Sequence, residues 1–236
     1  MNRSLSLYVT ARDGASRLEK KPDLPLWRGE AEGASRASVC LDERVTYQEI
    51  EGFGGAFTEA AAVTLGKIPA EKREEVLRAY FDPKAGHGYS LCRTHINSCD
   101  FALGNYAYCE EDGDFDLRSF SIERDRQALV PMIRRALEIS GNGFKLFASP
   151  WSPPAWMKTT GRMNRGGKLR PECRDVWARY YARYIREYEK EGVPIWGLTV
   201  QNEPEAVQPW DSCVYTGEEE RDFVRDHLGL RRAVQN

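Results

Sequence analysis

A carboxylate at the end of a short apolar run is the group in this chain best suited to acid–base chemistry. Residues 195–200 are mostly apolar and strand-forming, and Glu203 follows close behind them. Asn202 beside it can donate and accept hydrogen bonds to a hydroxylated substrate. Pro204 favours an extended backbone at Glu203. Because Asn-Glu-Pro is also typical of a plain turn, the pattern by itself supports a turn as well as a catalytic acid.

Polar and aromatic residues also follow other runs of strand-forming residues. Strands are expected over residues 45–50, 89–96, 144–148 and 195–201. The second carries Arg93 and precedes Asp100, and the third precedes Trp151. An indole can stack on the apolar face of a sugar ring, a carboxylate can bind its hydroxyls, and a guanidinium can keep a catalytic carboxylate ionised. Each residue also has a structural interpretation. Arg93 could be an ion-pair partner, Asp100 a turn residue and Trp151 a core anchor.

Helices are expected between and after these strands, and the alternation predicts an α/β fold. The helical patterns cover residues 70–80, 121–139, 174–191 and 217–228. In the third, Trp177, Tyr181, Tyr184 and Tyr188 recur at helical spacing, which indicates packing against a sheet. A parallel sheet with right-handed crossovers follows, as a doubly wound sheet or a (β/α)8 barrel. In a barrel the carboxyl ends of the strands converge on one face, where such enzymes place their sites.

Composition excludes several classes of protein. The 236 residues are 41% hydrophobic and 30% charged, with 34 basic and 36 acidic side chains, which is typical of a soluble domain and argues against nucleic-acid binding. No window approaches the roughly 20 apolar residues that cross a bilayer, so no membrane span is expected. The first ten residues resemble a β-strand and lack a signal-peptide core. We therefore expect a cytoplasmic protein, or a secreted one if the N-terminus is incomplete.

No cofactor or metal is expected. The glycine-rich residues 52–55 lack the G-x-G-x-x-G spacing of a dinucleotide-binding turn, so a nucleotide-dependent enzyme is disfavoured. The six cysteines form no Cys-x-x-Cys pair. Cys92, His95 and Cys99 lie close in sequence, but Cys92 and His95 point to opposite faces of a strand. Free thiols in a reducing compartment explain the cysteines more simply than a metal site.

Four ordered motifs carry a resemblance to a known family. They are GFGGAFTEA at residues 52–60, NSCDF at 97–101, ASPWSPPAWMK at 148–158 and QNEP at 201–204. In order and separation they resemble glycoside hydrolase family 30, the glucosylceramidase-like family, over roughly residues 48–229. The resemblance implies a (β/α)8 barrel with a side β-domain, and retaining hydrolysis of β-glycosides such as β-glucosides, glucosylceramide or β-glucans.

The resemblance also implies roles for individual residues. Glu203 corresponds to the general acid/base and Asn202 to the residue that binds the sugar 2-hydroxyl. The other implied substrate-binding positions are Arg93 near the nucleophile, Asp100 as a hydroxyl ligand, Trp151 at the pocket wall and Trp210 on the loop after the acid/base. Residues 1–47 would then be an N-terminal β segment of the side domain, and residues 48–236 the first half of the barrel, with about four β/α units.

One expected part is missing from these 236 residues. A retaining glycosidase needs two carboxyl groups about 5–5.5 Å apart, and the family's nucleophile is a glutamate at the end of the seventh strand. We therefore expect this chain alone to be inactive, and expect self-association because half a barrel exposes sheet edges. A non-catalytic carbohydrate-binding remnant of such an enzyme is the alternative, and sugar binding without turnover would distinguish it.

Overall fold

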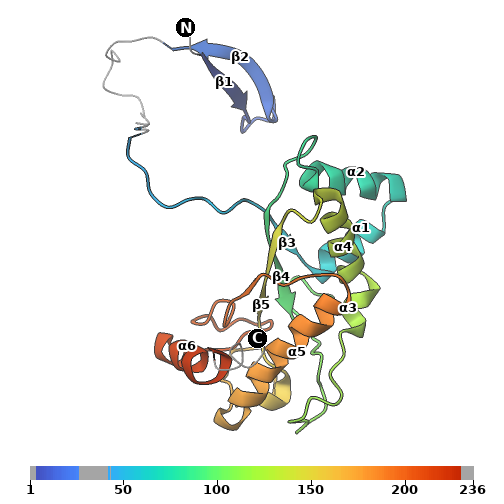
Figure 1. The fold of residues 1–236 in the computed structure, drawn as a ribbon, viewed down its shortest axis with the longest axis vertical. Helices are drawn as coiled ribbons and strands as arrows, with labels where there is room; N and C mark the ends of the chain where they lie inside the picture. The colour runs from blue at the N-terminus through green and yellow to red at the C-terminus, as the bar shows by residue number, and fades with distance from the viewer. Residues whose placement is uncertain (1–3, 27–41, 43, 230–236) are drawn as a thin grey trace. The chain divides into compact units, whose positions relative to one another are not determined.

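The computed structural model describes residues 4–26, 42 and 44–229 (Figure 1). The chain divides into two compact units, Met1–Gln48 and Glu49–Asn236. In the first unit, β1 (Ser4–Val9) and β2 (Glu19–Pro25) form an antiparallel hairpin with an irregular register between Leu5 and Leu7. The strand expected at the N-terminus is therefore present. Its assignment to a side β-domain stays a prediction.

The second unit has a parallel four-stranded sheet whose strands follow one another in sequence order, β3-β4-β5-β6. The strands are β3 (Ala56–Phe57), β4 (Leu91–Ile96), β5 (Lys145–Pro150) and β6 (Gly197–Leu198). The α-helices are α1 (Glu59–Gly66), α2 (Ala70–Phe81), α3 (Glu123–Gln127), α4 (Leu129–Ser140), α5 (Arg174–Lys190) and α6 (Gly217–Phe223). Short helical turns are η1 (Ala155–Met157), η2 (Pro171–Cys173) and the π-helical η3 (Val224–Leu228). This arrangement confirms the α/β prediction and is that of a partial barrel.

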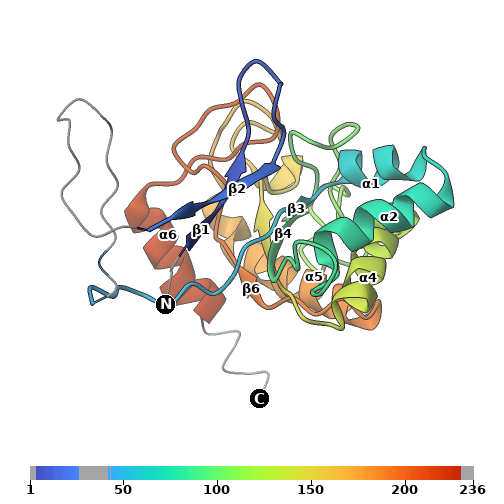
Figure 2. The same ribbon diagram turned by 90° about the horizontal axis from the view of Figure 1, so that it is seen from above.

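The two faces of the sheet differ in burial. Helices α1, α2 and α4 lie together beside β3 and β4 in both ribbon views (Figures 1 and 2). Strand pairing aligns Phe57, Thr94 and Ala148 in one row, and all three are buried. The neighbouring row contains Arg93 and Phe147, which are only half-buried. Since side chains alternate across a strand, one face is covered by helices and the other remains accessible.

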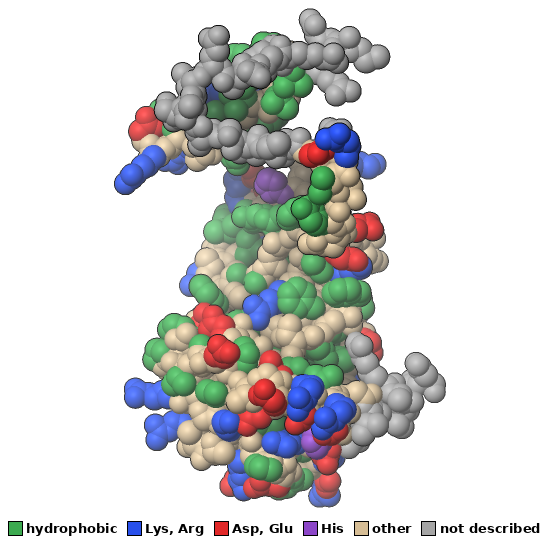
Figure 3. All heavy atoms as spheres, turned by 90° about the vertical axis from the view of Figure 1, so that its left-hand side faces the viewer, with side chains coloured by type: hydrophobic (Ala, Val, Ile, Leu, Met, Phe, Trp, Pro, Cys, Tyr) green, Lys and Arg blue, Asp and Glu red, His purple; other side chains and the backbone are tan. Residues whose placement is uncertain are grey.

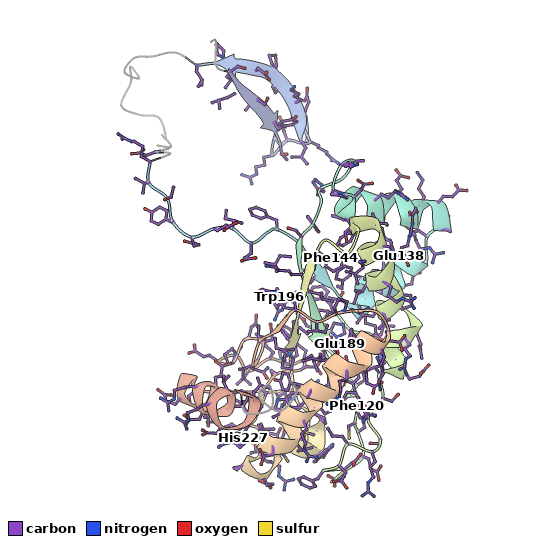
Figure 4. The ribbon with its side chains drawn as sticks, viewed as in Figure 1. Phe120, Glu138, Phe144, Glu189, Trp196 and His227 are labelled. Carbon is purple, nitrogen blue, oxygen red and sulfur yellow. The ribbon has the colours of Figure 1, made fainter. Side chains whose placement is uncertain are left out.

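The aromatic side of α5 forms much of the core, as its spacing predicted. Trp177, Tyr181, Tyr184 and Tyr188 are fully buried. Phe120, which is labelled in Figure 4, packs on Tyr180 of α5 at a ring-centroid distance of 4.8 Å.

A buried aspartate connects α3 and α5 within this core. The Asp125 carboxylate accepts hydrogen bonds from the hydroxyls of Tyr106, Tyr108 and Tyr188 at 2.6–2.8 Å. Because each oxygen of the carboxylate has a donor, the cost of burying this charge is partly offset.

The glycine-rich residues 52–55 allow a close backbone approach to β4. The Ser90 N–H donates to the Phe53 carbonyl, and the Arg93 N–H donates to the Gly55 carbonyl. A Cβ atom on Gly54 would lie closer than 3.0 Å to the Leu91 carbonyl oxygen. The segment therefore needs glycine for packing against β4, which gives this motif a structural role.

Several expected elements differ from the structure. Residues 45–50 form no strand, and Val45 and Ile50 are 54% and 67% exposed. Pairing with β4 begins instead in the glycine-rich segment. Helix α1, which was not expected, begins after Thr58, whose side chain accepts from the Ala61 N–H.

Three expected elements are present with altered bounds. The helix expected over 121–139 is interrupted at Ala128, whose φ and ψ are −144° and −46°. Alanine is a strong helix former, so its type does not mark this break. Strand β6 is shorter than expected, although hydrogen bonds from the Trp196 and Thr199 N–H groups extend its pairing with β5. The helix expected over 217–228 ends at Phe223 and continues as the π-helical η3.

The visible surface carries both signs of charge. Figure 3 shows basic and acidic side chains interspersed with apolar ones on the face that it presents. This distribution agrees with the near balance of 34 basic and 36 acidic residues. Within the described ranges, no helix is long and apolar enough to cross a membrane.

We expect Gly54→Ala to lower the free energy of unfolding by at least about 2 kcal/mol, because its methyl group would overlap the backbone of β4. Gly66→Ala is the matched control, since a Cβ atom there meets nothing within 4 Å and alanine favours the helix end. Urea unfolding of both variants measures the difference. Equal stability of the two variants would contradict the packing role.

Candidate functional site

The Arg93 guanidinium joins the ends of three strands. Its Nε donates to Ser149 Oγ on β5 at 3.0 Å, and its Nη2 donates to Asn202 Oδ1 beyond β6 at 2.7 Å. The guanidinium carbon also lies 4.6 Å from the ring centroid of Trp151. Arg93 is therefore in direct contact with two other predicted site residues, Trp151 and Asn202.

A hydroxyl pair supports this arginine from the same face. Thr199 Oγ1 donates to Ser149 Oγ at 2.7 Å, so one serine oxygen accepts from Thr199 and from Arg93. Phe147 lies two residues before Ser149 on β5, with its ring centroid 6.0 Å from the guanidinium carbon. Ser149 and Thr199 were not singled out from the sequence. Ser149 lies two residues after Phe147, and Thr199 lies two residues after Gly197, which pairs with Phe147. Because side chains two residues apart point to the same face of a strand, this spacing is the signal that would have identified both.

The segment after β6 is fixed by hydrogen bonds to the segment after β5. The Asn202 N–H donates to the Pro150 carbonyl at 2.8 Å, and the Gln201 side-chain amide donates to the Trp151 carbonyl at 2.7 Å. These bonds hold the segment of Trp151 against that of Asn202, although Trp151 and its partner Gln201 are 50 residues apart in sequence. The contacts explain why the two motifs lie together.

Glu203 has a left-handed backbone with φ of +47°, so the extended conformation expected from Pro204 is wrong. A non-glycine residue with positive φ is strained and is held by its surroundings. The Ala206 N–H donates to the Glu203 carbonyl and closes a tight turn. The Glu203 carboxylate is exposed, and its nearest hydrogen-bond partner is Gln208 Nε2 at 3.5 Å.

The charge of Arg93 is only partly compensated. Burial lowers the pKa of Arg93, while the nearby Cys99, Asp100 and Glu203 act in the opposite direction. None of these three is a hydrogen-bond partner of the guanidinium, whose partners Ser149 and Asn202 are neutral. Its positive potential therefore reaches the carboxylates at the mouth of the site.

Asp100 and Trp210 stand apart from this cluster. Both are exposed, Trp210 by 39%. Within residues 44–229, no hydrogen bond, ion pair or ring contact joins the Asp100 or Trp210 side chain to Arg93, Trp151 or Asn202. Asp100 acts on Arg93 through its charge alone, whereas Trp210 follows Glu203 on the same loop. Their predicted roles stay predictions.

Asn97, the first residue of the NSCDF motif, is a supporting residue for which the sequence predicted no role. It is fully buried with φ of +62°. Its Nδ2 donates to the Ser152 carbonyl at 3.0 Å, and its Oδ1 accepts from the Tyr108 N–H and the Tyr180 hydroxyl. The side chain thus ties the end of β4 to the loop that carries Trp151. Its place directly after the strand, within the NSCDF motif, is the sequence signal that could have identified it.

The His95 ring forms hydrogen bonds with two backbone groups. Its Nε2 accepts from the Glu59 N–H at 3.2 Å, so the neutral ring carries its hydrogen on Nδ1 and donates it to the Asn97 carbonyl at 2.6 Å. Burial raises the pKa of the Cys99 thiol to about 12, which disfavours the thiolate needed for metal binding. In the described ranges, no group of three or more His, Cys, Asp or Glu residues is placed to hold a metal ion.

Two other buried carboxylates near the strand ends have structural partners. Burial raises the pKa of Glu59, but hydrogen bonds from Arg124 at 2.6 Å and from the Leu103 N–H at 2.7 Å hold it below its usual range. Asp211 accepts from Ser98 Oγ at 2.6 Å and Asn105 Nδ2 at 2.8 Å. Both carboxylates therefore fix loops.

The assembled groups suit recognition of a hydroxylated ring. Arg93 contacts both an indole face and an amide oxygen, and an exposed carboxylate follows that amide directly along the chain. Aromatic faces and amide or carboxylate groups are complementary to the C–H faces and hydroxyls of a sugar. The exposed carboxylate is free to exchange a proton with a bound molecule.

Comparisons with known proteins give a consistent family. The family model described as "Glycosyl hydrolase family 30 TIM-barrel domain" matches residues 50–236. Lysosomal acid glucosylceramidase from Mus musculus is 36% identical over 200 residues, which are 81% of this chain and 39% of that protein.

Solved structures agree. The crystal structure of SrfJ from Salmonella typhimurium is 46% identical, with a TM-score of 0.78, over 81% of this chain and 43% of that one. A solved endo-β1,6-glucanase is 27% identical, with a TM-score of 0.80, over 98% of this chain and 50% of that one. The chain spans half or less of the length of each of these relatives.

We expect Asn97→Ala to destabilise the second unit by about 2–4 kcal/mol, because three buried hydrogen bonds are lost. Asn97→Gly should cost about 1 kcal/mol less, since glycine relieves the positive φ. Asn142→Gly is the control, because Asn142 has φ of +59° but is exposed, and should be neutral or slightly stabilising. Chemical unfolding measures all three variants. An Asn97→Ala variant as stable as the parent would exclude the supporting role.

Proposed function

Because this chain belongs to glycosyl hydrolase family 30, we propose that it supplies the acid/base half of the site of a retaining β-glycoside hydrolase. The single observation that carries the proposal is the Arg93–Asn202 hydrogen bond of 2.7 Å, which orients an amide directly before Glu203 through the same guanidinium that covers Trp151. The names of the relatives indicate glucosylceramide or a β-1,6-glucan as the class of substrate.

Each residue has a proposed part in the reaction. Glu203 protonates the glycosidic oxygen as the aglycone leaves, and later removes a proton from the attacking water. Asn202 binds a ring hydroxyl and is held in position by Arg93. Trp151 stacks on the sugar, and its own face is fixed by the same guanidinium. Asp100 binds a further hydroxyl, and Trp210 lines the side on which the leaving group departs.

We also propose that the nucleophile comes from a segment outside these 236 residues. A retaining reaction requires a second carboxyl group about 5–5.5 Å from the acid/base. The buried carboxylates of Glu59 and Asp211 are occupied by Arg124 and by Ser98 with Asn105. The 236-residue chain alone is therefore expected to bind a β-glucoside without hydrolysing it.

The test compares this chain with a fusion to the C-terminal part of the 46% identical SrfJ, using an aryl β-glucoside. We expect no turnover from the chain alone and turnover from the fusion. In the fusion, Glu203→Gln should lower kcat/KM by about 10²–10⁴-fold, because general acid–base catalysis contributes that much. Glu205→Gln is the matched control, two residues away and also exposed, and should change little.

The outcomes separate the parts of the proposal. Turnover by the 236-residue chain that Glu203→Gln abolishes would show that the nucleophile lies within it. A folded fusion in which Glu203→Gln is fully active would remove the acid/base role. A fusion that binds the glucoside in calorimetry without hydrolysing it would favour a carbohydrate-binding protein.

We further propose that the isolated chain self-associates. Strands β3 and β6 are the two edges of the sheet, and edges with unpaired backbone groups recruit other chains. Trp196, labelled in Figure 4, directly precedes β6 and is 53% exposed. Light scattering should detect oligomers, and Trp196→Lys should reduce them because a charge blocks edge pairing. A monodisperse parent chain with the mass of one copy would contradict the proposal.

A further inference from the structure

Lys158 is a buried cation that the proposed chemistry does not use. It follows η1 and is 2% exposed. Its Nζ donates to two main-chain carbonyl oxygens, those of Met163 at 3.0 Å and of Ser212. No carboxylate is among its hydrogen-bond partners in the described chain. A buried ammonium held only by carbonyls is costly, so its retention needs an explanation.

The two carbonyls belong to segments that are far apart in sequence. Residues 158–169 form an irregular hairpin closed by a bridge between Lys158 and Leu169. Residues 203–216 form the loop that carries Glu203, and a second bridge joins its Asp211 to Asn164 of the hairpin.

Further backbone bonds join this loop to the hairpin. The Ser212 N–H donates to the Met163 carbonyl at 3.1 Å, and the Val214 N–H donates to the Gly167 carbonyl at 2.8 Å. Lys158 therefore lies between the hairpin and the loop, with a hydrogen bond to each.

The contacts continue from this junction to the carboxylate. The Arg165 N–H in the hairpin donates to the Gln208 carbonyl at 2.9 Å and to the Trp210 carbonyl at 3.4 Å. Gln208 in turn is the residue whose side-chain amide approaches Glu203 Oε2 at 3.5 Å. The position of Glu203 thus depends on a turn that the hairpin holds.

We propose that Lys158 is a positioning residue that holds the 203–216 loop on the 158–169 hairpin and thereby orients Glu203 and Trp210. The catalytic part of this inference rests on the proposed function, whereas the structural part does not. A lysine suits the position because its long stem can cross from one segment to the other and its amine can donate to both carbonyls. Without it, the buried Ser212 carbonyl loses this donor.

Titration of Lys158 gives a distinctive signature. Burial is the main cause that lowers its pKa to about 8, and the facing Cys213 and Asp211 only partly oppose this. Unfolding returns the pKa to about 10.5. Between these values the folded chain has lost a proton that the unfolded chain keeps, so stability rises with pH in this window. A neutral amine still has two N–H groups, one for each carbonyl.

The experiment is hydrogen exchange of the 236-residue chain, read by mass spectrometry over residues 204–216. Lys158→Met removes the donor and keeps a similar stem. Lys168→Met is the matched control in the same hairpin, because the Lys168 side chain is exposed and its amine pairs with Glu219. We expect Lys158→Met to speed exchange of the loop at least about tenfold and the control to leave it unchanged. Equal exchange in both folded variants would overturn the proposal.

The pH signature provides a second test. The denaturant concentration at the unfolding midpoint is measured for the parent and for Lys158→Met. The difference, parent minus variant, should increase from pH 8 to pH 10.5. A constant or falling difference would refute the buried-cation account.

If Lys158→Met does not fold, acetylation of the unaltered chain decides instead. Lys158 should react at one-tenth or less of the rate of Lys168, and equal rates would overturn the proposal.

Kinetics of the SrfJ fusion test the catalytic part. Lys158→Met should lower kcat more than it raises KM, while Lys168→Met should leave both unchanged. Faster loop exchange with unchanged kcat would limit Lys158 to a structural role and overturn the catalytic part. If the fusion shows no turnover, the proposed function fails, and the exchange data still decide whether Lys158 holds the loop.

Discussion

The candidate site depends on one guanidinium that is held by neutral partners. Arg93 bonds to a serine hydroxyl and an asparagine amide and covers an indole, so its orientation is fixed without a carboxylate in contact. A contact carboxylate would neutralise the charge locally. In the described part of the chain no carboxylate contacts Arg93, and the nearby charges of Asp100 and Glu203 interact with the guanidinium without a hydrogen bond. The same residue therefore connects β4, β5 and the segment after β6 at the candidate site.

The difference in burial between the two faces of the sheet explains how the charged side chain of Arg93 is accommodated. Helices bury the row that contains Thr94 and Ala148, whereas Arg93 and Phe147 lie on the half-buried face. A charge on the helix-covered face would be fully desolvated. On the open face it keeps contact with solvent and with polar side chains from β5 and from the segment after β6. Parallel order β3-β4-β5-β6 is what brings those strands together.

The loops beyond the strands are fixed by buried polar groups. Asn97 ties the end of β4 to the Trp151 loop and to α5, and Lys158 links the hairpin to the Glu203 loop. Asn97 donates to the buried Ser152 carbonyl, and Lys158 donates to the carbonyls of Met163 and Ser212. Irregular loops can therefore hold Trp151 and Glu203 in defined positions. Glu203 retains a strained φ of +47° within this framework.

The sequence by itself determined the α/β class, the buried aromatic side of α5 and the grouping of Arg93, Trp151 and Asn202, because periodicity and strand ends are local properties. It did not determine the break at Ala128, the pairing of residues 53–55 with β4, or the left-handed backbone of Glu203. Local propensity favours the opposite conformation at Ala128 and at Glu203. At Glu203 the neighbouring tertiary hydrogen bond decided the conformation, since Asn202 and Pro150 lie far apart in sequence and meet only when the sheet has formed.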